Sequence, residues 1–298
     1  MSPAASDTVL RLRRSAPGRV ATEAARHGVR AVGAATAGHR PGPDLLVVGA
    51  KRGGTTSLWH YLVEHPGVLP LFPAAEHLKG LYYFDEQYHR GARWYRSHFA
   101  TREYRAWLED RLGHRSVAAE ASPYYLFHPL AAARARAEVP GALVVALVRD
   151  PVERAFSHWK ERRRHTERLG FAEALAAEPL RTAGEERRLV RNPGALSFAH
   201  RHQTYVAQGR YLEPLRRWTE AFGRDRVEVV VAEEFFADPQ RTMDRLWDRL
   251  GLPPHQLRSP EAHNAAPSPD MDPVVRAALE RRVAPDVAAL EAFLGRPL

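Results

Sequence analysis

Cationic, glycine and hydroxyl residues gather in one stretch of the sequence, residues 49–57, which reads GAKRGGTTS. Its glycines allow the backbone to approach a ligand closely. If a helix begins here, its first N–H groups are unpaired and its N-terminus carries partial positive charge. The stretch therefore predicts a cradle for a phosphate or sulfate group. Its candidate binding residues are Lys51, Arg52, Gly53, Gly54, Thr55, Thr56 and Ser57.

The residues on either side of this stretch are of the kind that would position it. Residues 45–48 form a short apolar run, which predicts a buried strand. After the hydroxyl residues, Leu58, Tyr61 and Leu62 recur at helical spacing. We therefore expect a strand, a glycine turn and a helix in that order.

A second strand-to-helix junction lies about a hundred positions further along, in the segment ALVVALVRDPVERAFSHW. Its apolar run, residues 143–148, predicts a strand covered on both faces. The run ends at Arg149, and Pro151 suits the first turn of a helix that carries Ser157. Since ligands bind outside the carboxyl ends of parallel strands, we expect Arg149 and residues 49–57 to face one crevice.

The composition narrows the possible chemistry. The chain has 298 residues, 44% of them hydrophobic, so it can bury a sizeable core. It has no cysteine, which excludes disulfides, thiolate metal sites and cysteine nucleophiles. No apolar run approaches the roughly 18 residues of a membrane span, and residues 1–20 lack the apolar core of a signal peptide. We therefore expect a cytoplasmic protein without an integral membrane segment.

The basic residues are unevenly divided between arginine and lysine. The net charge is +9, which suits an anionic partner without selecting one, and we expect no nucleic-acid partner. Only Lys51, Lys79 and Lys160 are lysines among the 44 basic residues. A compact ammonium can follow a transferring group more readily than a planar guanidinium can. The lysines in or near residues 49–57 are therefore candidates for a role in the site, although their positions could equally be accidental.

The order of predicted elements favours a single α/β domain with a mostly parallel, P-loop-like sheet flanked by helices. Residues 1–43 are expected to form a basic, flexible extension with a short helix around 21–32, and residues 44–298 the domain. Further strands are predicted at 81–84, 117–119 and 227–231. Helices are predicted at 91–99, 129–138 and 239–250, with one opened by residues 205–211 and running to 222, and a last one ending at 294.

Residues 160–198 are rich in arginine and only weakly periodic. Such charge runs are usually solvated helix faces. The alternative is a mobile insertion that covers or recognises an acidic acceptor.

The first junction nearly matches the P-loop of nucleotide triphosphatases, since four residues separate two glycines. However, Thr55 stands where such an enzyme has its lysine. No strand reads as a source of a magnesium ligand, so we expect no metal.

Together, these segments resemble the sulfotransferases that use 3′-phosphoadenosine 5′-phosphosulfate (PAPS), especially bacterial relatives of the heparan sulfate N- and 3-O-sulfotransferases. The stretch VGAKRGGTTSLWHYLVEHP is similar to the family's 5′-phosphosulfate loop, and LVRDPVERAFSHW to its 3′-phosphate motif. The resemblance extends from residue 44 to the C-terminus through FDEQYHRGARWYRSHF, EASPYYLFHP and GRYLEPLRRW.

The resemblance implies in-line transfer of a sulfuryl group from PAPS, as co-substrate, to a hydroxyl or amine of a glycan or small-molecule acceptor. It assigns the 3′-phosphate to Arg149 and Ser157, and adds Tyr211 to the nucleotide-binding residues. Lys51 and Arg52 would stabilise the leaving group.

Two positions depart from the family pattern. Gly80 stands where heparan sulfate enzymes have a glutamate base, so the base is expected among Glu76, His77, Asp85 and Glu120. Glu120 matches the E-x-S/T-P segment of the family, and we place it among the catalytic candidates, with a structural role in fixing that loop as the alternative. Near the C-terminus, residues 263–265 (HNA) replace a basic loop over the nucleotide.

Two other functions remain open at this point. A P-loop-type nucleotide kinase is disfavoured by Thr55. A non-catalytic binding protein on a sulfotransferase scaffold is suggested by Gly80. The acceptor and the oligomeric state are not readable from the sequence.

Overall fold

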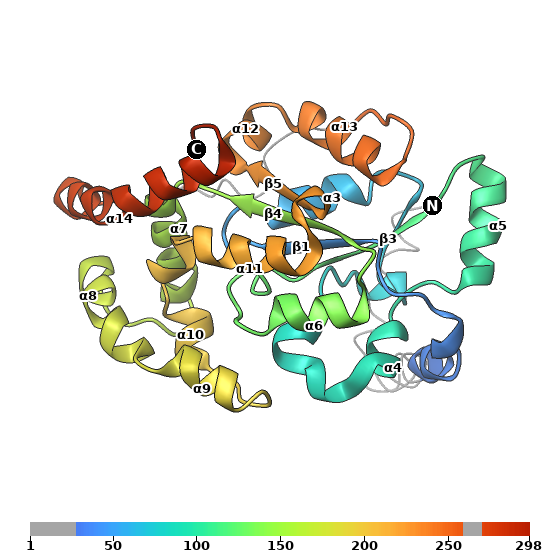
Figure 1. Ribbon diagram of the computed structural model, residues 1–298, viewed down its shortest axis with the longest axis horizontal. Coiled ribbons are helices and arrows are strands. Elements are labelled where there is room, and N and C mark those ends of the chain that lie inside the picture. The colour runs from blue at the N-terminus through green and yellow to red at the C-terminus, as the bar shows by residue number, and fades with distance from the viewer. Residues whose placement is uncertain (1–27, 259–269) are drawn as a thin grey trace, which may run out of the picture.

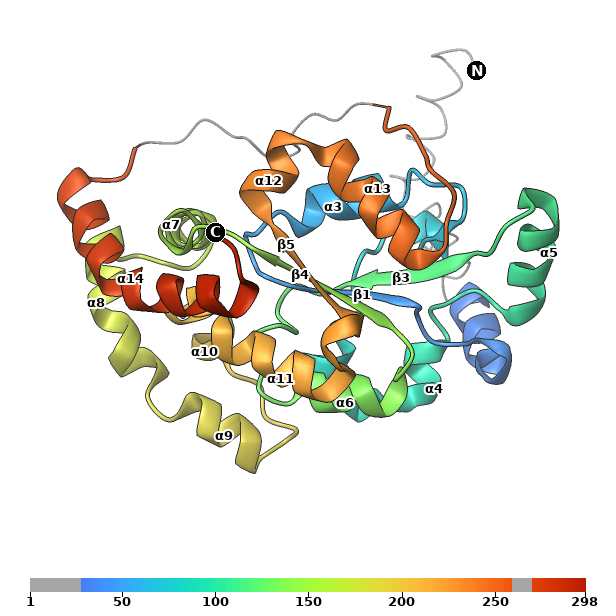
Figure 2. The same ribbon diagram turned by 45° about the horizontal axis from the view of Figure 1, so that its top comes forward.

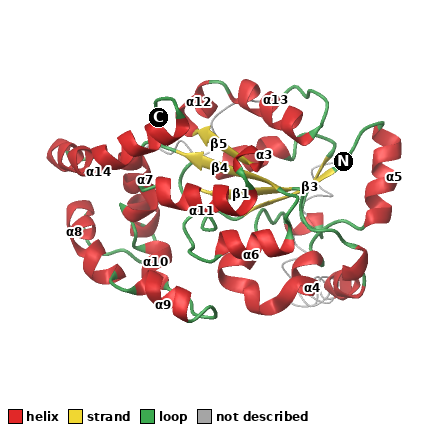
Figure 3. Ribbon diagram, in the orientation of Figure 1, coloured by secondary structure: helices red, strands yellow, loops and turns green. Residues whose placement is uncertain are grey.

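The computed structural model describes residues 28–258 and 270–298 and contains a five-stranded sheet in the order β2-β3-β1-β4-β5. All four strand pairs are parallel, and β1 lies at the centre. Figure 3 shows helices surrounding this sheet. The expected α/β architecture is therefore confirmed. The strands are β1 Leu45–Gly49, β2 Val68–Leu69, β3 Val117–Ala121, β4 Leu143–Val148 and β5 Val227–Val231.

The strand order changes direction at β1. From β1 the chain runs to edge strand β2, returns to β3, and then crosses to β4 on the other side of β1. The carboxyl ends of β3, β1 and β4 therefore open side by side at one edge of the sheet. In open α/β sheets this is where ligands bind.

Helices cover both faces of the sheet (Figures 1 and 2). Successive side chains along a strand alternate between these faces. In β1, Leu45 and Val47 pack with one cluster, and Leu46 and Val48 with the other. The first face is covered by α3 Thr55–Leu62, α12 Ala232–Ala237 and α13 Pro239–Leu250, and the second by α4 Gly91–Arg96, α6 Ala131–Glu138 and α11 Leu212–Phe222.

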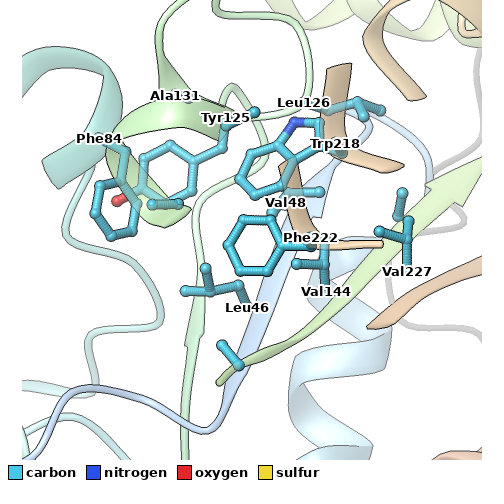
Figure 4. Packing of buried hydrophobic residues seen from close by; sticks show 14 of the residues in the cluster. Leu46, Val48, Phe84, Tyr125, Leu126, Ala131, Val144, Trp218, Phe222 and Val227 are labelled. Carbon is cyan, nitrogen blue, oxygen red and sulfur yellow. The ribbon is translucent and has the colours of Figure 1, made fainter. Parts of the chain in front are cut away.

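Figure 4 shows the second core cluster, in which Leu46, Val48 and Val144 of the strands lie against Trp218 and Phe222 of α11. All five side chains are buried. Burial of such apolar side chains contributes about 1.5–3 kcal/mol each. The strands whose ends carry the site are therefore held in place by a closely packed core.

A third cluster lies beyond the sheet and joins α7 Pro151–Arg163, α8 Phe171–Thr182 and α14 Pro273–Leu294. The arginine-rich segment continues through α9 Glu185–Arg191 to α10 Phe198–His202. In α9, Arg187 and Arg188 are exposed and Leu189 is buried. In α9 this pattern is that of a solvated helix face, the first of the two interpretations of residues 160–198, but Arg162, Glu167 and Glu178 of the same segment are buried. The remaining helix, α5 Arg102–Leu112, lies at the opposite side of the molecule (Figure 1).

The predicted strand at residues 81–84 is wrong. Tyr82 has φ of 50°, and residues Tyr83–Gln87 form a π-helical turn. Side chains take the N–H groups that a strand partner would need: Glu120 accepts from Leu81 N, Ser122 Oγ from Tyr82 N and Tyr125 Oη from Tyr83 N. Aromatic packing, not strand pairing, therefore explains the apolar residues here.

The outcome for the other predicted boundaries is mixed, and the helix expected to be opened by residues 205–211 begins at Leu212, as α11. β4, β5 and α13 have the predicted limits. Residues 28–35 are helical and overlap the short helix expected at 21–32, whose first part lies outside the described residues. The replaced basic loop at 263–265 also lies outside them. Within the described ranges, no helix is both long and apolar enough to cross a bilayer.

Candidate functional site

The loop between β1 and α3 is tightly wound around its glycines. Gly54 precedes α3 with φ of 101°, a conformation that favours glycine, and a Cβ there would lie 2.8 Å from Phe236. At Gly53 a Cβ would lie 3.1–3.2 Å from the carbonyl oxygens of Ala50 and Leu147. No side chain caps the N-terminus of α3. The start of α3 is therefore left without a side-chain cap, and the binding of an anion there stays a prediction.

Arg52 joins the two predicted junctions. Its Nε donates a 3.0 Å hydrogen bond to Ser157 Oγ on α7, across 105 positions of sequence. Its carbonyl oxygen accepts a 3.3 Å hydrogen bond from Arg149 Nη1. The structure therefore brings Arg52, Arg149 and Ser157 together.

Lys51 points from the loop towards α7 and α10. Its Nζ lies 3.5 Å from Glu161 Oε2 and 3.3 Å from His202 Nδ1. Burial lowers its pKa to about 8, although Glu161 opposes that effect. Lys51 is thus a partly buried cation of the loop, and its lowered pKa places the loss of its charge near pH 8.

Buried groups of α7 support the loop from below. Arg154 is fully buried and donates to the carbonyl oxygens of Lys51, at 3.4 Å, and Tyr205. His158 is also fully buried, and its ring nitrogens have no hydrogen-bond partner within the described residues. Burial and the nearby charge of Lys51 lower the pKa of His158 well below its usual value. The sequence showed both residues on the helix but did not indicate their role beneath the loop.

Tyr211 is placed behind Arg149. Its hydroxyl donates a 2.9 Å hydrogen bond to the Arg149 carbonyl oxygen and accepts one of 3.4 Å from the Arg149 N–H. Tyr211 is buried. Its visible role is to hold the backbone from which the Arg149 side chain extends.

Glu120 is a fully buried carboxylate with four hydrogen-bond donors. Oε1 accepts from Leu81 N, Ser122 Oγ and Tyr125 Oη at 2.7–2.9 Å, and Oε2 accepts from Tyr95 Oη at 2.6 Å. Burial raises its pKa. This arrangement favours the structural alternative, in which Glu120 fixes the loop at residues 81–83.

The other predicted base candidates have different surroundings. Glu76 forms an ion pair with Arg30, and His77 is exposed. Asp85 is buried, and burial raises its pKa well above the usual value. Its Oδ1 accepts from Glu86 N at 2.6 Å.

Lys79, one of the rare lysines noted in the sequence but not one of the binding residues named there, contacts the loop. Its Nζ donates a 2.9 Å hydrogen bond to Thr56 Oγ1 in the first turn of α3. Burial, followed by the positive charge of Arg52, lowers its pKa to about 8. The rarity of lysine in this chain was the signal that could have identified it. Within residues 28–258 and 270–298, no group of three or more His, Asp or Glu residues is placed to bind a metal.

Comparisons with known proteins agree on one family. The family model described as "Sulfotransferase domain" matches residues 42–268. Human bifunctional heparan sulfate N-deacetylase/N-sulfotransferase 3 is 28% identical over 218 residues, which are 72% of this chain and 23% of that protein. Human heparan sulfate glucosamine 3-O-sulfotransferase 6 is 29% identical over 219 residues, which are 72% of this chain and 54% of that protein.

A solved structure supports the same relationship. The sulfotransferase from Alicyclobacillus acidocaldarius is 29% identical to this chain, and the superposition has a TM-score of 0.61. It covers 86% of this chain and 97% of the Alicyclobacillus chain. The chain spans less than two thirds of the length of the curated relatives above. With a family model that matches most of its length, and with the predicted anion-binding junctions in contact, the chain belongs to the sulfotransferase domain family.

Proposed function

We propose that the protein transfers a sulfuryl group from PAPS to a hydroxyl or amine of an acceptor. The observation that carries this proposal is the contact between Arg52 and Ser157, which joins the two junctions that the sequence predicts to bind anions. A donor with a phosphosulfate at one end and a 3′-phosphate at the other matches two such junctions.

The residues present fit this donor. The uncapped start of α3 and the cations Lys51 and Arg52 suit the phosphosulfate, with the hydroxyls of Thr55 and Thr56 as further donors. On the other side of the contact, Arg149 and Ser157 suit the 3′-phosphate, since a guanidinium binds phosphate with directed hydrogen bonds.

Each group then has a defined task. Lys51 and Arg52 stabilise the negative charge that develops on the leaving 3′,5′-bisphosphate. Arg154 holds the loop backbone and keeps the surroundings positive. Tyr211 fixes Arg149, and Glu120 fixes the segment that follows Gly80. Transfer by these groups requires no metal.

For the acceptor we propose a glycan or a small molecule. Two of the relatives are named for acting on heparan sulfate, an anionic glycan, and the chain carries a net charge of +9. This support does not extend to the position that is sulfated.

The test is transfer of ³⁵S from labelled PAPS, in EDTA, to a panel of N-deacetylated heparan sulfate, heparosan and simple phenols. We expect labelled product with at least one acceptor, and loss of labelling in an Arg52→Ala variant. Magnesium-dependent phosphoryl transfer from ATP instead would support a kinase. Binding of 3′,5′-ADP without transfer to any acceptor would support a non-catalytic binding protein.

A further inference from the structure

The position where the family resemblance places a glutamate base cannot hold a side chain in this protein. A Cβ on Gly80 would lie 2.3 Å from the carbonyl oxygen of Ala121 and 2.5 Å from Ser122 Oγ. Contacts this short exclude any residue larger than glycine without movement of the backbone of β3. The acceptor of the sulfuryl group must therefore lose its proton to a residue other than the one at position 80.

The carboxylates near Gly80 are poorly suited to this task. Both oxygens of Glu120 are occupied by donors, and Glu76 is paired with Arg30. Asp85 is buried and its raised pKa favours the neutral acid, which cannot accept a proton.

Lys79 immediately precedes Gly80 and is held at the loop. Its carbonyl oxygen accepts a 2.6 Å hydrogen bond from Ala121 N, which fixes its backbone against the end of β3. Its Nζ reaches Thr56 Oγ1, 2.9 Å away, in the first turn of α3. The amino group thus lies at the helix start that we propose binds the phosphosulfate.

We propose, on the basis of the proposed sulfuryl transfer, that Lys79 is the catalytic residue that removes the proton from the acceptor. The neutral amine of Lys79 takes the proton as the acceptor oxygen or nitrogen forms its bond to sulfur. The bond between sulfur and the bridging oxygen breaks, and its electron pair leaves with 3′,5′-ADP. The Lys79 ammonium then releases the proton to solvent.

The surroundings of Lys79 favour its neutral amine over the ammonium more strongly than bulk water would. Burial penalises the ammonium, and the guanidinium of Arg52 repels it, so that the pKa is lowered from 10.5 to about 8. A base with this pKa is partly deprotonated at neutral pH, and more so as the pH rises. Turnover should therefore increase with pH up to about 8 as Lys79 loses its proton, and should fall at higher pH as Lys51 loses the positive charge that we propose stabilises the leaving group.

Two substitutions distinguish a role of Lys79 as a base from a role that needs only its positive charge. Lys79→Arg keeps a cation but cannot accept a proton at these pH values, and Lys79→Met keeps the length without the charge. We expect both to lower kcat at least 100-fold on the acceptor found above, while the Kd for 3′,5′-ADP changes less than threefold. The matched control, Lys160→Arg, should keep the wild-type kcat and pH profile. A Lys79→Arg enzyme with more than a tenth of wild-type kcat and an unchanged pH profile would overturn the proposal.

A second measurement does not depend on an acceptor. Because the chain has only three lysines, protein labelled with ¹³C at lysine Cε should give three resolvable signals, assigned by Lys→Arg substitutions. We expect the Lys79 signal to titrate near pH 8 and to shift when 3′,5′-ADP is added. Titration of Lys79 above pH 10, with and without 3′,5′-ADP, would rule it out as the base. Failure of the wild type to transfer sulfate at all would instead refute the proposed function.

Discussion

The two strand-to-helix junctions of the site differ in whether a side chain caps the N-terminus of their helix. After β1, α3 begins behind Gly54 with no side-chain cap. After β4, α7 begins behind Asp150, whose side chain accepts a 2.8 Å hydrogen bond from Glu153 N, and Pro151 occupies the first turn. One helix start is open and the other is closed by its own sequence.

This difference fits two modes of anion recognition, which we propose for the two junctions. The β1–α3 junction can offer backbone N–H groups and the helix dipole to a ligand. At the β4–α7 junction the side chain of Asp150 already caps the helix N-terminus. This junction therefore offers side chains instead, namely Arg149 before the helix and Ser157 two turns into it. Arg52 connects the two modes through its hydrogen bond to Ser157.

Removing Arg52 should have the largest effect, because it serves both junctions. We expect Arg52→Ala to weaken 3′,5′-ADP binding at least 100-fold, measured by calorimetry. Arg102→Ala is the matched control, since Arg102 is exposed on α5 at the far side of the molecule (Figure 1). Binding by Arg52→Ala within threefold of the wild type would show that the junctions work independently.

Removing Arg149 should affect the second junction most, although it also removes the 3.3 Å hydrogen bond to the Arg52 carbonyl oxygen. We expect Arg149→Ala to weaken binding of 3′,5′-ADP by about 30-fold and to leave binding of 5′-AMP nearly unchanged, because 5′-AMP lacks the 3′-phosphate. A charge-assisted contact of this kind contributes about 1.5–3 kcal/mol. Equal losses for the two nucleotides would place Arg149 at the 5′ end instead.

Lys51 should make nucleotide binding depend on pH. Its lowered pKa of about 8 means that the ammonium is present below pH 8 and is lost as the pH rises through that value. We therefore expect the affinity for 3′,5′-ADP to fall up to about tenfold between pH 7.5 and 9.5, a range in which phosphate charge is constant. Lys51→Met should bind more weakly at pH 7.5 and show a flatter profile. A wild-type affinity independent of pH in this range would argue against a contact between Lys51 and the nucleotide.

The cap at the second junction should matter for stability more than for binding. We expect Asp150→Ala to lower the free energy of unfolding by about 1 kcal/mol, as for other N-caps, in urea denaturation. Thr101→Ala, which removes the cap of α5, should cost a similar amount. The 3′,5′-ADP affinity of Asp150→Ala should stay within threefold of the wild type. A tenfold loss would mean that the capped junction also binds through its backbone.

The sequence predicted the elements whose signals are local. The apolar runs that became β4 and β5 and the amphipathic repeat of α13 gave correct limits, because continuous burial and helical spacing are visible within a few residues. The family resemblance, confirmed by the matching domain model, also came from local motifs.

The failures involve partners distant in sequence. The strand predicted at 81–84 was wrong because Glu120, Ser122 and Tyr125, some 40 positions away, take its N–H groups. Long-range hydrogen bonds also occupy both oxygens of Glu120, and a further one joins Lys79 to Thr56, 23 positions away. Within residues 76–85, only the rarity of lysine in this chain pointed to the side chain that reaches the loop.

The most direct test of the two-junction account is calorimetry of the wild-type protein in EDTA with 3′,5′-ADP and with 5′-ADP. Both ligands carry two phosphate groups on adenosine, but only 3′,5′-ADP has one at each end of the ribose. We predict one site per chain that binds 3′,5′-ADP at least 30-fold more tightly than 5′-ADP. Equal binding of the two ligands, or binding of 5′-ADP alone when magnesium is added, would contradict the account.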